Sequence, residues 1–383
     1  MYTPVCIQDF ETHAFKVLPK GTLDYYKSGA GQQLTLANNR TAFSKLRIRP
    51  RCLRNVRTRS LSTTVMGTKA ALPFGIAPTA MQKLAHPDGE LASARAAEKM
   101  GTIFILSTIS TTSIEDVAAA APNATKWFQL YIYKDREVTA NLVKRAEISG
   151  FKAIVVTVDS PMFGIRRDDV RNNFKMPPHI TLANFVGEKA TSVSKRQSGS
   201  GIGNYVASLF DASLEWEDIR SLKKLTTLPI MVKGILTKED ALKAVEIGVS
   251  AIVVSNHGGR QIDSVPASIE VLPEIVKAVG SKVEIYFDGG VREAVDVFKA
   301  LALGAKMVSL YLVSNYCKVF FISQVFMGRP ILWGLAYNGE EGVTKVLKVL
   351  KSELENVMTI AGCRSISDIK PDMVVHESYY SRL

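Results

Sequence analysis

The chain has 383 residues, of which 46% are apolar and 22% are charged. This composition supplies enough hydrophobic material for one large core or two modest ones, and it excludes disorder as the main state. Lysine and arginine exceed aspartate and glutamate by 48 − 36 = 12, which suits nucleic acid, an anionic membrane surface or a small anionic substrate. The densest basic run, residues 47–59, has no interleaved aromatics. We therefore interpret it as a solvated face and expect no nucleic-acid partner.

The four cysteines lie far apart and form no CxxC pair or Cys/His cluster, so we expect neither a metal site nor a disulfide scaffold. The N-terminus lacks a charged region followed by an apolar one, which predicts no secretory signal. At the other end, Ser381-Arg382-Leu383 is a conservative variant of the Ser-Lys-Leu peroxisomal address, which would be read by the import receptor.

The first 70 residues precede a repeating pattern, in which a short β-branched run is followed by a helix-length amphipathic stretch. The runs are residues 72–77, 102–107, 127–132, 153–158, 229–234, 251–256 and 284–289. An eighth is expected to begin near residues 305–308, after a helix over 291–303. Eight such units predict an α/β fold, a TIM (β/α)8 barrel, with an N-terminal helical extension. A final helix after Asn338, ending at Gly362, would cover the barrel.

We interpret residues 1–383 as one domain, with 1–70 as the extension and 71–383 as barrel and C-terminal tail. Two stretches break the pattern. Residues 188–208 are polar and glycine-rich and predict an excursion between strands four and five, with a linker rather than a dinucleotide loop. Residues 308–324 are apolar but contain Asn315, Lys318 and Gln324, which excludes a membrane span.

Polar residues end five consecutive strands of the predicted barrel. Because the reactive groups of such barrels lie at the C-terminal ends of the strands, these residues predict one shared site. They are Gln129 and Tyr131, Thr157 and Asp159, Lys233, Ser255 and His257, and Asp288-Gly289-Gly290.

The loop from Ser255 to Gln261 places His257 three residues before Arg260. A guanidinium can hold a carboxylate while a nearby imidazole takes a proton from the same molecule, which suits a hydroxy acid. Lys233 could form a Schiff base, as in an aldolase, or lie as a fixed charge against an electron-poor ring. Glycine-rich segments at 288–292 and 328–330 predict a phosphate site and favour the second reading.

These residues resemble the FMN-dependent 2-hydroxy-acid oxidase family over almost the whole chain. The most specific segments are residues 24–26, 78–82, 129–131, 255–261 and 288–292. The resemblance is greatest to the peroxisomal animal oxidases. It implies FMN-dependent oxidation of (S)-2-hydroxy acids to 2-oxo acids, by hydride or carbanion transfer, with O2 reduced to hydrogen peroxide. A peroxisomal location and a homotetramer are also implied.

The resemblance assigns roles to individual residues. His257 would be the base and Asp159 its partner, with Arg166 and Arg260 as the carboxylate clamp and Tyr25 and Tyr131 as hydroxyls near the substrate. Lys233 would lie beside the flavin. The ring contacts would be Pro78, Thr79, Ala80, Ser107, Gln129, Thr157 and Ser255, and the ribityl and phosphate contacts Asp288, Gly289, Gly290, Arg292, Gly328 and Arg329.

The chain departs from the family pattern at two places. Glycolate-preferring members carry tryptophan where this chain has Ile109, which predicts a pocket reshaped for medium or longer 2-hydroxy acids. Residues 308–324 have no counterpart and are expected to interrupt strand eight, since deleting them joins Met307 to Val325 and restores the family pattern.

We hypothesise that residues 308–324 are a short retained intron translated in frame, and the alternative is a genuine loop. In the folded chain the insertion is expected to bulge between the start of strand eight and the phosphate loop. It would then weaken strand pairing and FMN binding, and a flavin-free barrel with impaired activity is the corresponding alternative function.

Overall fold

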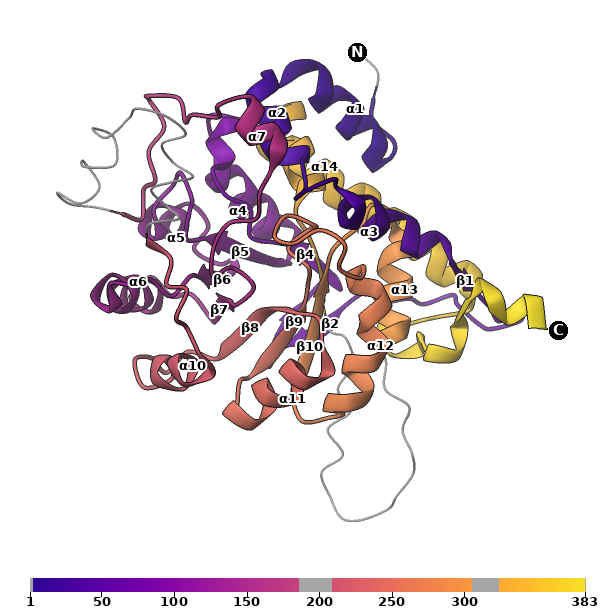
Figure 1. Ribbon diagram of the computed structural model, residues 1–383. Coiled ribbons are helices and arrows are strands. Elements are labelled where there is room, and N and C mark those ends of the chain that lie inside the picture. The colour runs from indigo at the N-terminus through magenta and orange to yellow at the C-terminus, as the bar shows by residue number, and fades with distance from the viewer. Residues whose placement is uncertain (1–2, 186–208, 305–323, 383) are drawn as a thin grey trace.

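The computed structural model describes residues 3–185, 209–304 and 324–382. Eight parallel strands close into a barrel (Figure 1), each paired with two neighbours. In chain order they are β4 (Phe74–Ile76), β5 (Ile103–Ser107), β6 (Thr125–Leu130), β7 (Ile154–Thr157), β8 (Ile230–Ile235), β9 (Ala251–Val254), β10 (Glu284–Asp288) and β11 (Gln324–Met327). The predicted TIM barrel is confirmed, and β4 to β10 lie within the seven predicted runs or within two residues of them.

Helices surround the barrel because each has one apolar face to bury. They are α4 (Gly89–Met100), α5 (Ile114–Ala120), α6 (Arg136–Ile148), α10 (Trp216–Leu222), α11 (Lys238–Ile247), α12 (Ser268–Val279), α13 (Ala294–Gly304) and α14 (Arg329–Ala361). Local sequence sets their ends. The side chains of Ser113, Asp135 and Thr237 accept hydrogen bonds from backbone N–H groups of the helices they precede. Gly101 and Gly248 end α4 and α11 in the left-handed conformation.

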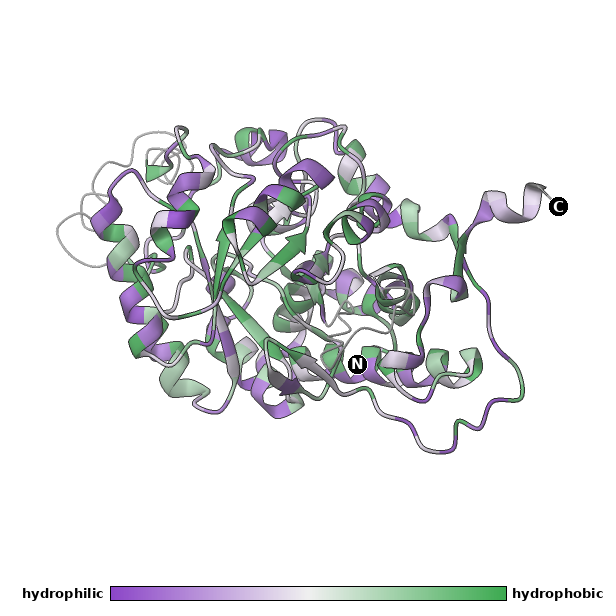
Figure 2. Ribbon diagram, turned by 90° about the horizontal axis from the view of Figure 1, so that it is seen from below, coloured by the Kyte–Doolittle hydropathy of each residue, from purple (hydrophilic) through white to green (hydrophobic). Residues whose placement is uncertain are grey.

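The N-terminal extension wraps the outside of the barrel. It contains α1 (Ile7–Val17), α2 (Lys20–Lys27), α3 (Leu34–Ser44) and β1 (Leu46–Ile48). Strand β1 pairs antiparallel with β12 (Val374–His376), so residues 46–48 of the extension and the C-terminal segment lie together on an arm beside the barrel (Figure 2). The arm also holds η2 (Ile366–Asp368), η3 (Pro371–Met373) and η4 (Glu377–Arg382). The N-terminal extension is held to the rest of the chain by this pairing and by contacts of α1 and α2 with α14.

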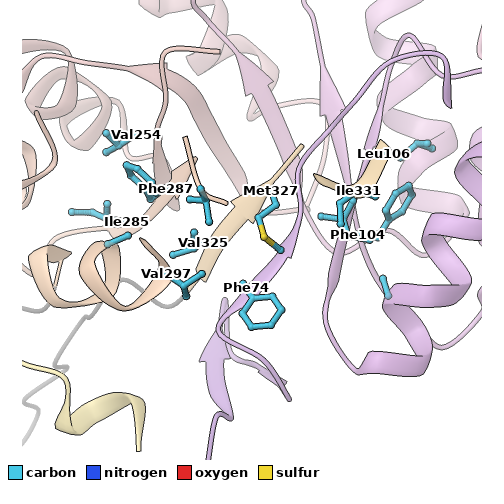
Figure 3. Packing of buried hydrophobic residues seen from close by; sticks show 14 of the residues in the cluster. Phe74, Phe104, Leu106, Val254, Ile285, Phe287, Val297, Val325, Met327 and Ile331 are labelled. Atoms are coloured by element: carbon cyan, nitrogen blue, oxygen red, sulfur yellow. The ribbon is translucent and has the colours of Figure 1, made fainter. Parts of the chain in front are cut away.

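Two apolar layers hold the barrel together. Inside it, Trp127, Tyr286 and Phe326 pack with their rings 5.3–6.1 Å apart. The hairpin of β2 (Thr63–Val65) and β3 (Thr68–Ala70) joins this inner cluster through Val65 and Ala70. The outer layer lies between strands and helices. Figure 3 shows part of it, with Phe74, Phe287, Val297, Val325 and Met327 close together. The filled interior makes the barrel a rigid support for the residues at its rim.

The C-terminal helix was predicted to start after Asn338, whereas helix α14 begins at Arg329. The backbone leaves helical geometry at Asn338 and Gly339, so the predicted segment is the second half of a broken helix, and it ends at Gly362 as expected. Its first half was missed because it directly follows the predicted phosphate segment, which we treated as a loop.

The eighth strand, as far as it is described, is Gln324–Met327, and the start expected near residues 305–308 lies outside the described residues. Gln324 was assigned to the insertion, yet it is buried in the strand, aligned with Tyr286 of β10, and its Nε2 donates to Thr102 Oγ1 (3.3 Å). The strand runs directly into Gly328, and β11 pairs with both neighbours. The expected weakening of strand pairing is not found in Gln324–Met327, whereas the bulge expected after the start of strand eight falls outside the described residues.

Some predictions fall outside the described residues. These include the whole excursion at 188–208, residues 308–323 of the insertion, and Leu383 of the C-terminal tripeptide. Within the described chain, the helices are too short or too polar to cross a membrane.

Candidate active site

A cavity opens at the C-terminal ends of the barrel strands. Its volume, with the open mouth included, is about 1020 Å³. Nearly every residue assigned to the site from the sequence lines it. They are Tyr25, Pro78, Thr79, Ala80, Ser107, Gln129, Tyr131, Thr157, Arg166, Lys233, His257, Arg260, Asp288, Gly289, Gly290, Arg292, Gly328 and Arg329. Asp159 and Ser255 do not line the cavity themselves. Asp159 contacts His257, and Ser255 contacts Lys233, and both of these partners line it.

His257 and Asp159 form a hydrogen-bonded pair of titratable side chains at the cavity. His257 follows β9 with a left-handed backbone (φ 57°), and its N–H donates to Ser255 Oγ (3.0 Å). Asp159 follows β7, and its Oδ1 lies 2.9 Å from His257 Nδ1. The two side chains are only 20% and 15% exposed. The Nδ1 contact leaves Nε2 as the ring nitrogen available to a ligand.

Burial and the pairing act in opposite directions on the two groups. Burial lowers the pKa of His257 below its usual value, against the opposing effect of the Asp159 charge. Burial would raise the pKa of Asp159, but the adjacent imidazole and the Lys233 charge leave it below its usual value. At neutral pH the imidazole is therefore neutral and able to accept a proton, beside a carboxylate that is charged.

Lys233 is a buried cation held by two neighbouring strands. Its Nζ donates to Ser255 Oγ (2.8 Å) and lies 3.2 Å from Asp288 Oδ2. Ser255 Oγ donates in turn to Asp288 Oδ1. Lys233 is 4% exposed and lines the cavity. The ammonium is thus fixed at the wall as an ion pair, which opposes its use as a free amine nucleophile.

A chain of neutral polar groups crosses three strand ends. Gln129 Nε2 donates to Thr157 Oγ1 (3.1 Å), and Gln129 Oε1 accepts from Ser107 Oγ (3.3 Å) and Thr108 N (3.2 Å). All four residues are buried. Because these hydrogen bonds fix the orientation of the Gln129 amide, the four residues present defined donors and acceptors to a flat polar ligand.

Two arginines and two tyrosines gather near the mouth. The Arg260 guanidinium lies over the Tyr25 ring (5.1 Å) and donates to the carbonyls of Tyr25 and Ser28. Burial, with the like charge of Arg166, lowers the pKa of Arg260 to about 10. Arg166 lies 4.0 Å from the Asp169 carboxylate, and its Nε has no hydrogen-bond partner. Burial raises the pKa of Tyr131, so its hydroxyl stays protonated. The two arginines and two tyrosines together suit a small carboxylate as ligand.

Arg292 and Arg329 form a second cationic group, the cationic end of the cavity, which adjoins Arg260. Arg329 is half-buried and donates to the carbonyls of Tyr26, Ser28 and Gly258. Burial and the neighbouring arginines hold its pKa well below the usual value. Arg292 has a buried Nε without a partner, and burial lowers its pKa to about 10. Buried guanidinium groups that donate only to neutral carbonyls or have an unpaired N–H indicate an anionic ligand.

Gly289 and Gly290 shape this cationic end. Both have positive φ (113° and 86°). A Cβ at Gly290 would lie 1.9 Å from the Asn39 carbonyl oxygen, and one at Gly289 would lie 2.7 Å from Ser268 Oγ. Only glycine fits, so the backbone makes a close turn beside Arg292. The polar chain, the buried ammonium and this cationic end together suit a ligand with a polar ring and a phosphate, which are the features of FMN.

Other residues of the cavity were not assigned from the sequence. They include Phe163 and Leu332, which line it beside Ile109, a residue already singled out. Phe163 lies between Asp159 and Arg166 in a segment with little secondary structure, and Leu332 lies in the first turn of α14. No local pattern distinguishes such residues from ordinary core, because their role depends on which loops the barrel brings together. Among the described residues, no cluster of His, Cys, Asp or Glu could hold a metal ion.

The comparisons with known proteins agree with this site. The chain matches the family described as FMN-dependent dehydrogenase over residues 14–313 and 322–376. It is 51% identical over 372 residues to 2-hydroxyacid oxidase 1 of Homo sapiens, covering 97% of this chain and 96% of that one. It is 48% identical over 363 residues to glycolate oxidase of Spinacia oleracea, covering 95% and 93% of the two chains.

Among solved structures, mandelate oxidase with (S)-4-hydroxymandelic acid superimposes with a TM-score of 0.87 at 39% identity, covering 96% of this chain and 98% of that one. Family match, full-length identity and fold agree. The chain belongs to the FMN-dependent dehydrogenase family, and FMN is its cofactor.

Proposed function

We propose that this protein oxidises (S)-2-hydroxy acids to 2-oxo acids and reduces O2 to hydrogen peroxide. The observation that carries the proposal is the His257–Asp159 pair, which shares one cavity with Arg166 and Arg260. A base and two guanidinium groups at one end of a cavity suit a molecule that carries both a carboxylate and a transferable proton. Relatives named 2-hydroxyacid oxidase 1 and glycolate oxidase, each about half identical to this chain, support the same activity.

His257 is the proton acceptor of the reaction. Its Nε2 takes the hydroxyl proton of the substrate in a hydride route, or the α-carbon proton in a carbanion route. Asp159 stabilises the imidazolium that results, because its carboxylate accepts a hydrogen bond from Nδ1 (2.9 Å). Bound FMN supplies the two-electron chemistry, accepting electrons from the substrate and passing them to O2.

Arg166 and Arg260 hold the substrate carboxylate, while Tyr25 and Tyr131 offer hydroxyls to its polar end. At the cofactor, Lys233 provides a positive charge held by Asp288 and Ser255. Ring contacts come from Pro78, Thr79, Ala80, Ser107, Gln129, Thr157 and Ser255. Ribityl and phosphate contacts come from Asp288, Gly289, Gly290, Arg292, Gly328 and Arg329, with the unpaired Nε of Arg292 as a donor for the phosphate.

The substrate class is a medium or longer 2-hydroxy acid. Ile109 is 5% exposed and lines the cavity with Phe163 and Leu332, so an aliphatic side chain forms the wall where glycolate-preferring relatives carry tryptophan. Burying a hydrocarbon substituent of the substrate against this apolar wall is favourable. Faster turnover of glycolate than of a longer homologue would contradict this assignment.

The protein works in the peroxisome as a homotetramer. Ser381-Arg382-Leu383 is the segment offered to the import receptor, and Ser381 is exposed at the end of η4. The location is tested with a fluorescent fusion and a version lacking the last three residues, and the tetramer by light scattering of the purified protein.

The decisive experiment is the visible spectrum of the purified chain before and after anaerobic addition of a 2-hydroxy acid. A flavin spectrum that bleaches, followed by peroxide when air is admitted, supports the proposal. His257→Asn is the matched control, because asparagine tolerates the left-handed backbone at this position. It should keep the flavin colour and lose the bleaching. A colourless protein trapped by borohydride with substrate would instead support an aldolase at Lys233.

The origin of the segment at residues 308–324 is a separate proposal. A retained intron predicts two transcript lengths across the junction, and a single long product would favour a genuine loop. Comparing the spectrum of the complete chain with that of a version lacking residues 308–324 tests whether the segment matters for FMN. Closure of the barrel by β11, directly before Gly328, supports an FMN-binding rather than a flavin-free chain.

A further inference from the structure

A buried carboxylate lies behind the wall of the cavity. Glu90, in the first turn of α4, is 0% exposed. Its Oε1 accepts from the backbone N–H groups of Gln82 and Thr111 (both 2.9 Å), and its Oε2 accepts from the hydroxyls of Thr111 (2.7 Å) and Thr112 (2.9 Å). Among the described residues, no lysine or arginine forms an ion pair with it. Only neutral donors satisfy this carboxylate.

The donors come from two loops that form the cavity wall. Gln82 ends the segment 78–82, whose first three residues line the cavity, and Thr111 follows the cavity residues Ser107 and Ile109. The two loops are joined directly by one hydrogen bond, from Met81 N to the Ile109 carbonyl (3.0 Å). Glu90 accepts from both loops at once, so it fixes their separation.

A second connection from α4 reaches the cavity through Gln82. Ser93 Oγ donates to Gln82 Oε1 (2.7 Å), and Gln82 Nε2 donates to Thr79 Oγ1 (2.9 Å). Tyr26, another cavity residue, donates its hydroxyl to the Met81 carbonyl (2.7 Å). Its pKa is raised by burial first and, in smaller part, by the charges of Tyr25 and Glu90. The carboxylate is therefore electrostatically close to the cavity as well as mechanically connected to it.

We propose that Glu90 is a positioning residue that holds the loops 78–82 and 107–112 together and so determines how the flavin ring and the substrate side chain are seated. The effect of Glu90 on substrate binding rests on the proposed function, whereas its effect on FMN binding rests on FMN being the cofactor of the family. Glu90 does not line the cavity, and it acts through Thr79 and Ile109.

Two substitutions test whether Glu90 positions the two loops or only stabilises the fold. Glu90→Ala removes all four acceptor contacts. Glu90→Gln keeps one carbonyl oxygen for the two backbone N–H groups, and its amide can donate to the threonine hydroxyls. Glu98→Ala is the matched control on the same helix, because Glu98 accepts from the backbone of Asn123 and does not line the cavity. The readouts are the Kd of the apoprotein for FMN, the absorption spectrum of bound flavin, and kcat and KM for a short and a long 2-hydroxy acid.

We expect Glu90→Ala to raise the Kd for FMN at least about tenfold, the effect of one lost contact to a charged group. It should also shift the flavin spectrum and raise KM more for the long acid than for the short one. Glu90→Gln should restore the Kd to within about threefold of the parent. A folded Glu90→Ala protein with unchanged Kd and spectrum would overturn the proposal, as would failure of Glu90→Gln to rescue either.

If Glu90→Ala does not fold, Thr112→Val removes a single donor and leaves the carboxylate in place. It should raise the Kd for FMN by a smaller factor, and an unchanged Kd would overturn the proposal. If no 2-hydroxy acid reduces the parent enzyme, the proposed substrate class has failed, while the Kd measurements still test Glu90.

Discussion

Replacing Asp159 with asparagine removes the charge beside the imidazole of His257, the proposed base, and keeps the shape of the side chain. The amide oxygen can still accept the hydrogen bond from His257 Nδ1, now 2.9 Å from a carboxylate oxygen. Asp159 Oδ2 is buried without a hydrogen-bond partner, so the new NH2 group replaces an atom with no bond to lose. The substitution therefore reports the charge of Asp159 rather than its packing.

The magnitude follows from the contact. A hydrogen bond to a charged group contributes about 1.5–3 kcal/mol. The imidazolium forms only as the proton is transferred, so this energy is lost mainly from the transition state. Since 1.36 kcal/mol is tenfold in rate, kcat should fall about 10- to 150-fold.

The pH dependence of the activity is a second, independent test of the role of the Asp159 charge. Burial lowers the pKa of His257, and the Asp159 charge opposes that effect. Activity is lost at low pH when His257 becomes protonated and cannot act as base. Removing the charge lowers the pKa of His257 further, so the acidic limb of the kcat/KM profile should move to lower pH while the plateau falls.

The assay is steady-state peroxide formation across pH, with Ser160→Ala as control because Ser160 Oγ also donates to Asp159 Oδ1 (3.0 Å) and should have a smaller effect. An unchanged kcat in the asparagine variant, or an acidic limb displaced to higher pH, would refute the reasoning.

Three further predictions concern other parts of the cavity. Lys233→Met should lower the reduction potential of bound FMN, because a buried positive charge that favours the reduced, anionic ring is lost; spectroelectrochemical titration checks this, and a raised potential contradicts it. Gly290→Ala, whose Cβ would lie 1.9 Å from the Asn39 carbonyl oxygen, should unfold at a lower urea concentration than Gly150→Ala, which has a similar φ (78°) but no atom within 4 Å of its Cβ. Backbone strain alone accounts for about 1–3 kcal/mol in either variant. Equal midpoints of urea unfolding would show that the close contact at Gly290 is relieved. Ile109→Trp should shift the ratio of kcat/KM values toward glycolate, measured against a longer 2-hydroxy acid, and no shift would remove Ile109 from the determinants of specificity.

The barrel could be predicted because each of its units has a strong local pattern. Buried parallel strands such as residues 153–158 are mostly apolar runs, and helix-length amphipathic stretches, some with clear caps as in α11, alternate with them. Strand eight was the exception. The start expected near residues 305–308 lies outside the described residues, and local pattern did not show that Gln324, assigned to the insertion, belongs to the strand. Its pairing with β10, together with that of β11 with β4, places Gln324–Met327 in the barrel.

Most residues of the site could be predicted from the amino-acid sequence alone. Polar residues at consecutive strand ends must converge when parallel strands close into a barrel, so His257, Lys233 and Asp288 were found without coordinates. The resemblance to a known family then added residues outside the strands, such as Tyr25 and Arg166.

Which of these groups are in contact could be seen only in the folded chain. The 2.9 Å contact between His257 and Asp159 joins residues 98 positions apart, and the ion pair of Lys233 with Asp288 joins two strands that are not adjacent in the barrel. Glu90 gives no functional signal in the sequence, because a glutamate in the first turn of a helix is ordinary. Its role depends on two loops folding over it, and contacts between distant segments are set by packing, which no local pattern records.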